Sequence, residues 1–72
     1  MTPKDEQFFK ALGIRIAQAR KSHRLTQQQL AERLGIAQQT LAHYEVGRLR
    51  PSISMLSKLV LLLDLSLDEL LG

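Results

Sequence analysis

The 72-residue chain contains no cysteine and no tryptophan, and only two of its residues are histidine. Without cysteine there can be no disulfide framework, no thiolate metal site and no cysteine nucleophile. A structural zinc site needs four nitrogen or sulfur ligands, so two isolated histidines do not support one. No nucleophile stands with a histidine and a carboxylate in a recognisable catalytic arrangement. The sequence therefore predicts neither an enzyme nor a protein that holds a metal or another cofactor.

Long apolar segments are also lacking. The longest apolar run covers residues 59–63, far short of the roughly 20 residues that a membrane span needs. The first 12 residues carry four charged side chains, which is unlike a signal peptide. At 44% hydrophobic and 24% charged residues, the composition is that of an ordinary globular domain. We expect a single soluble intracellular domain over residues 1–72.

Positive charge is concentrated in the middle of the chain. Residues 10–50 hold eight basic residues against two acidic ones, whereas residues 51–72 hold one basic residue against three acidic ones. A basic cluster of this kind favours a polyanionic partner such as nucleic acid. An ordinary solvated surface has the same composition, so charge alone leaves both interpretations open.

The apolar residues recur at helical spacing, and no segment alternates as a strand would. This pattern predicts an all-α fold of five helices with short connections, over residues 5–22, 27–34, 38–46, 53–63 and 67–71. Thr26 and Ser66 are each followed three residues later by Gln or Glu, which is typical of a capping box at a helix start. Gly35 suits the left-handed backbone conformation of the residue that ends the second helix. The buried stripe of the fourth helix is predicted to be Ile53, Leu56, Leu59, Val60 and Leu63.

Two of these helices are short and joined by a tight turn at Gly35-Ile36, so residues 26–47 have the layout of a helix-turn-helix. In such a unit the second helix enters the major groove of DNA. The segment TQQQLAERLGIAQQTLAHYEVG closely resembles the helix-turn-helix of the Cro/cI-type (XRE-family) regulators. The family pattern covers about residues 10–71 and is matched at Arg20, Thr26-Gln27, Leu30-Ala31, Gly35-Ile36, Leu41, Glu45, Gly47, Pro51, Leu67 and Leu70.

The resemblance implies a compact five-helix bundle like the lambda-repressor DNA-binding domain. It also implies a transcriptional regulator, acting as a repressor in the cytoplasm of a bacterium or encoded by a phage. The alternative is an antitoxin or adaptor of the same fold whose main role is to bind a protein partner such as a toxin. An excess of leucines and the acidic C-terminal end favour that alternative, whereas the basic middle of the chain favours double-stranded DNA.

The third helix presents polar residues on the face opposite Leu41 and Tyr44. A glutamine amide can form two hydrogen bonds with adenine, so Gln38 and Gln39 are predicted to contact bases, with His43 as a weaker candidate. Phosphate contacts are predicted for Gln27, Thr40, Arg48 and Arg50. The family resemblance also implies that Gln27 braces the recognition helix. Lys21 and Arg24 are weaker phosphate candidates. A solvated surface is the alternative for Gln38, Gln39, His43, Arg48 and Arg50.

The resemblance further implies a largely buried salt bridge between Arg20 and Glu45, which would fix how the third helix is presented. The chain departs from the family pattern in three places. Arg24 stands where glycine is usual in the turn before the second helix, and Ala37 stands where Ser or Thr often caps the recognition helix. The third departure is Leu61-Leu62, which occupies positions that are more often polar or small.

A homodimer is expected, because one recognition helix reads only a few base pairs. Two recognition helices about 34 Å apart would read a palindromic operator. Leu56, Leu59 and Leu63 are expected to fill the core, which leaves Met55, Leu61 and Leu62 as the predicted dimer interface. The alternative is that a small five-helix core spreads widely enough to bury these three side chains.

Overall fold

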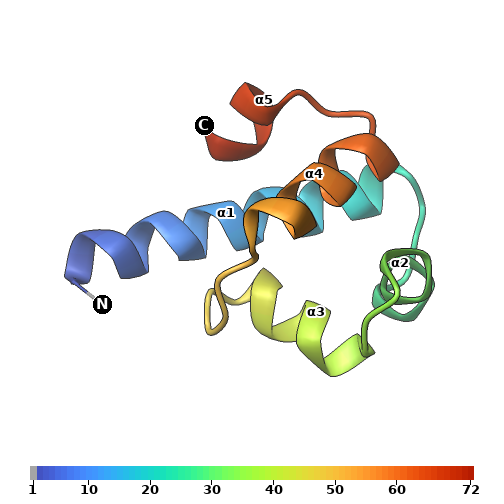
Figure 1. Cartoon of the computed structure of the whole chain (residues 1–72), viewed down its shortest axis with the longest axis horizontal. Helices are drawn as coiled ribbons and strands as arrows, with labels where there is room; N and C mark the ends of the chain where they lie inside the picture. Colours follow the sequence, from blue (N-terminus) through green and yellow to red (C-terminus); the bar gives the residue numbers. More distant parts are fainter. Residues whose placement is uncertain (1) are drawn as a thin grey trace.

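The computed structural model describes residues 2–72, and all regular structure in this part of the chain is α-helical. The predicted all-α fold and the number of helices are confirmed. The helices are α1 (Pro3–Ser22), α2 (Gln27–Leu34), α3 (Gln38–Glu45), α4 (Ile53–Leu62) and α5 (Leu67–Leu71) (Figure 1). Helix α1 begins two residues earlier than predicted because Thr2 and Asp5 form a capping box ahead of Pro3, and proline is favoured at the first helical position.

The ends of the other helices follow the sequence signals. Thr26 and Ser66 accept hydrogen bonds from backbone N–H groups three residues ahead and complete capping boxes. Ala37 precedes α3 without any side-chain cap. Arg24, in the position that favours glycine, has a left-handed backbone with φ +57°, which costs roughly 1 kcal/mol for a residue with a Cβ. Asp64 has φ +53°, a second left-handed position that the sequence pattern did not predict.

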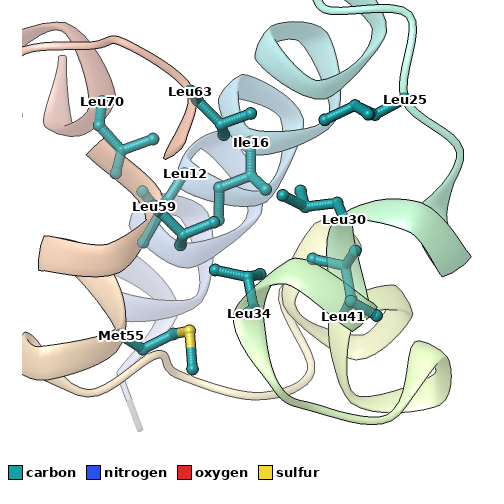
Figure 2. Packing of buried hydrophobic residues seen from close by; sticks show 11 residues of the cluster. Leu12, Ile16, Leu25, Leu30, Leu34, Leu41, Met55, Leu59, Leu63 and Leu70 are labelled. Atoms are coloured by element: carbon teal, nitrogen blue, oxygen red, sulfur yellow. The ribbon is translucent and has the colours of Figure 1, made fainter. Parts of the chain in front are cut away.

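The hydrophobic core draws residues from all five helices and from the turn between α1 and α2. Leu12 and Ile16 of α1, Leu30 of α2, Leu41 of α3 and Leu59 of α4 are each at most 1% exposed. Figure 2 shows these side chains converging between the helices, and Leu25, Ala31, Leu34, Met55, Leu63 and Leu70 complete the cluster.

Two predictions for α4 are wrong. Ile53 was expected in the buried stripe but is 84% exposed, and Met55 was expected at a dimer surface but is 8% exposed. The buried stripe is spaced by four residues and runs through Met55, Leu59 and Leu63. Ile53 lies about 200° around the helix axis from Met55, at 100° per residue, and therefore faces away from the core. Leu61 and Leu62, at 81% and 38% exposed, lack an inward role as expected.

Helices α1 and α3 pack with their backbones close together. A Cβ added to Gly13 of α1 would overlap the carbonyl oxygens of Tyr44 and Glu45 at the end of α3, so only glycine permits this packing. Helix α3 lies at one edge of the molecule and α5 at the opposite edge (Figure 1). The outer face of α3 is therefore open to a ligand, while its inner face is fixed against the longest helix of the fold.

Candidate nucleic-acid interface

Helix α3 buries one face and exposes the other. Leu41 is fully buried and Tyr44 packs against the core. Gln38 and Gln39, in the first turn, are exposed, and His43 is half-buried one turn further along the helix. The structure thus places the three predicted base-reading residues on the outer side of the helix. Because α3 has no side-chain cap, the N–H groups of its first turn remain available to an incoming acceptor.

A buried ion pair fixes the other end of α3. The guanidinium of Arg20 donates to both carboxylate oxygens of Glu45, from Nε over 2.7 Å and from Nη2 over 3.0 Å. Its third donor, Nη1, reaches the carbonyl oxygen of Leu25 over 2.8 Å. Both residues of the pair are only 8% exposed, so the predicted salt bridge is confirmed as a buried, two-pronged contact between α1 and α3.

Gln27 extends this network to α2. Its side-chain Nε2 donates to Oε1 of Glu45 over 3.0 Å, and its side chain is half-buried. This hydrogen bond joins Gln27 to the helix that the family resemblance implies it braces. The carboxylate of Glu45 at the end of α3 accepts hydrogen bonds from both preceding helices. Helices α2 and α3 are therefore joined by a hydrogen bond as well as by packing.

A protein-family model described as helix-turn-helix, HTH_3, matches residues 16–70. The chain belongs to this helix-turn-helix family. The matched segment runs from α1 to α5 and contains the α2–turn–α3 unit, the buried ion pair and the basic loop after α3. The resemblance to Cro/cI-type regulators is confirmed by this match.

Named relatives of this helix-turn-helix chain include transcription factors. It is 43% identical over 58 residues to the uncharacterized HTH-type transcriptional regulator YobD of Bacillus subtilis, covering 81% of this chain and 52% of that protein. It is 38% identical to the transcriptional repressor RstR of a cryptic CTXphi phage in Vibrio cholerae, with 81% and 52% covered. The chain therefore spans about half the length of these relatives.

The fold is also that of a solved regulator. The restriction-modification controller protein C.AhdI from Aeromonas hydrophila superimposes with a TM-score of 0.80 at 27% sequence identity. The match covers 86% of this chain and 94% of the controller protein. The structural match thus covers most of both chains.

Of the remaining predicted phosphate contacts, Thr40 is half-buried on α3 and the two arginines lie on the loop after it. Arg48 and Arg50 are exposed, as the sequence predicted. Arg50 also lies over the ring of Phe9 from α1, with 5.6 Å from its Cζ to the ring centroid. This cation–π contact joins residues 41 positions apart, and no local pattern could have revealed it.

Hydrogen bonding to Thr2 lowers the pKa of Asp5, and the positive charge of Arg50 lowers that pKa further.

The described residues hold no group of three or more histidine, aspartate or glutamate side chains that could bind a metal ion. None of the helices in residues 2–72 is long and apolar enough to cross a membrane.

The two weaker phosphate candidates, Lys21 and Arg24, are both exposed near the end of α1.

Proposed function

We propose that this helix-turn-helix chain binds double-stranded DNA sequence-specifically and represses transcription from the site that it occupies. The observation that carries the proposal is the exposed, glutamine-bearing face of α3, held rigidly by the Arg20–Glu45–Gln27 network. The names of YobD and RstR, a transcriptional regulator and a repressor, support regulation of transcription rather than a role centred on a protein partner.

Base recognition belongs to the first half of α3. Gln38 and Gln39 are exposed at its N-terminal end, where residues of a helix inserted in the major groove meet base edges. A glutamine can bond bidentately to N6 and N7 of adenine. His43, one turn further along and half-buried, would contact a neighbouring base pair.

The backbone of DNA would be held on both sides of α3. Gln27 at the start of α2 and Thr40 on α3 are half-buried, which leaves part of each polar side chain for a phosphate oxygen. Arg48 and Arg50 are exposed on the loop that follows α3. Neutralising phosphates with these groups releases bound counterions, so affinity should fall steeply as salt rises.

A homodimer would carry two such units on a palindromic operator. Leu61 and Leu62 at the end of α4 are exposed, and so is Leu67 at the start of α5. Helices α4 and α5 contact each other, and α5 lies at the edge of the molecule opposite α3 (Figure 1). A dimer formed through these leucines would leave both recognition helices free. Met55 is part of the core and takes no part in this interface.

The test is a selection of bound sites from random duplex DNA with the wild-type chain and the Gln38→Ala, Gln39→Ala and Gln18→Ala variants. Wild type should select one motif. Each α3 variant should lose preference at particular base pairs, by about 1–3 kcal/mol, whereas Gln18→Ala, an exposed change on α1, should leave the motif unchanged. If wild type selected no motif, the proposed function would be wrong. If neither α3 variant altered the motif, the base-reading assignment would be wrong.

A further inference from the structure

A groove of about 710 Å³ runs between the first half of α1 and the end of α3. Glu6 and Lys10 of α1 form one wall. The opposite wall consists of side chains from the outer face of α3 and from the turn that follows it. These are Ala42, His43, Val46, Gly47 and Arg48. The groove therefore continues the surface that carries the base-reading glutamines.

Beside this groove, α1 and the turn after α3 pack closely. Gly47 has φ +79°, and a Cβ added to it would lie 3.0 Å from the Cα, N and Cγ atoms of Lys10. Glycine at this position thus lets the backbone of Lys10 lie directly beside the end of the recognition helix. Lys10 is an exposed residue of α1, the helix that precedes the helix-turn-helix.

The position of the groove relative to α3 decides which ligand it meets. A helix with its side chains is about 10–12 Å across and nearly fills a major groove about 12 Å wide. Surfaces on either side of an inserted recognition helix must then face the two bordering phosphate backbones. Gln27 contacts α3 from α2, whereas the groove with Lys10 lies between α1 and α3 and includes Arg48 in its lining.

The charges in the groove favour an anion. Lys10 and Arg48 are positive, His43 can add a further N–H donor, and Glu6 is the one acidic group in the lining. A phosphate seated between Lys10 and Arg48 would have donors from two separate elements. The negative charge of Glu6 would repel the same phosphate and therefore lower the affinity of the groove for it.

We propose that this groove binds a phosphate of the DNA backbone, that Lys10 is a phosphate contact, and that Glu6 weakens binding by charge repulsion. The inference rests on the proposed DNA-binding function and adds α1 to the DNA interface. Because the contact is to the backbone, it contributes affinity without sequence preference.

Duplex binding by the whole chain, measured by fluorescence anisotropy at several salt concentrations, tests this proposal. The selected duplex and a random-sequence duplex of equal length serve as probes. Lys10→Gln should weaken binding to both duplexes, by up to about eightfold at 0.1 M salt, and reduce the salt slope by about one. Lys10→Arg should retain wild-type affinity. Lys58→Gln removes the same charge from α4, outside the groove, and should have little effect because exposed charges are screened beyond about 10 Å.

Replacing Glu6 should change the affinity for DNA in the opposite direction. Glu6→Gln should strengthen binding to both duplexes, whereas Asp68→Asn on α5, at the edge opposite α3 (Figure 1), should not. Melting temperatures near that of wild type would show that all variants are folded. Equal affinities of Lys10→Gln and Lys58→Gln would refute the groove assignment while leaving the proposed function intact. A wild-type chain without salt-dependent affinity for either duplex would refute both.

Discussion

Replacing Glu45 with alanine breaks the buried network from one side. The change removes the acceptor of three hydrogen bonds, two from Arg20 at 2.7 and 3.0 Å and one from Gln27 at 3.0 Å. Arg20 is only 8% exposed in the wild-type structure, and the carbonyl oxygen of Leu25 would be its one remaining partner among those contacts. The variant therefore leaves a buried guanidinium without a counter-charge.

The expected cost is large for a domain of this size. Leaving one member of a buried ion pair unpaired typically costs about 3–5 kcal/mol. At roughly 0.05–0.15 kcal/mol per residue, the whole chain has about 4–11 kcal/mol of stability. Glu45→Ala should thus remove near half of that stability. Since 1 kcal/mol shifts the Tm of a small domain by about 4–8 °C, the Tm should fall by about 12–40 °C.

Thermal unfolding followed by far-UV circular dichroism measures this shift. Glu32→Ala, an exposed change on α2, is the matched control and should stay within about 0.5 kcal/mol of wild type. The double variant Arg20→Met, Glu45→Leu removes both charges together and should recover much of the lost stability. It should recover less of the DNA affinity, because the link from Glu45 to Gln27 stays broken.

A Glu45→Ala variant that melted within about 4 °C of wild type would contradict this reasoning. The pair would then contribute no more than an exposed salt bridge, under about 1 kcal/mol. A double variant as unstable as Glu45→Ala would show that packing, rather than the unpaired charge, accounts for the loss.

Two further changes probe the dimer and the strained turn. The double variant Leu61→Lys, Leu62→Lys should sediment as one protomer per half-site duplex and lose paired binding on a two-half-site duplex. Ile53→Lys, about as exposed as Leu61 but at the other end of α4, should pair normally. Normal pairing of the double variant would exclude this interface. Arg24→Gly should raise the free energy of unfolding by roughly 1 kcal/mol, because glycine relieves the left-handed backbone, and it should also weaken DNA binding. Asp64→Gly, at a residue with a similar φ, should only raise the free energy of unfolding. An Arg24→Gly variant that is less stable than wild type in urea unfolding would show that the turn is not strained.

Local signals in the sequence determined the five helices and the turns between them. Capping boxes at Thr26 and Ser66 and the left-handed Gly35 depend on residues within one helical turn, so a single sequence specifies them. The outward position of Gln38 and Gln39 followed in the same way, because the helical period fixes which side chains lie opposite Leu41. The Arg20–Glu45 pair came instead from the family resemblance, since its members are 25 positions apart.

The tertiary structure decided which of several apolar stripes on α4 is buried. The helix has more leucines than one stripe needs, and periodicity alone cannot choose among them. The placement of α4 against α2 and α5 selects Met55 and leaves Ile53 in solvent.

Only the tertiary structure could also bring Lys10 beside Arg48 and place Arg50 over Phe9. These arrangements join the first half of α1 to a loop about 40 residues later. They exist because Gly13 and Gly47 let the two backbones come close, which is a property of packed surfaces that no local sequence pattern records.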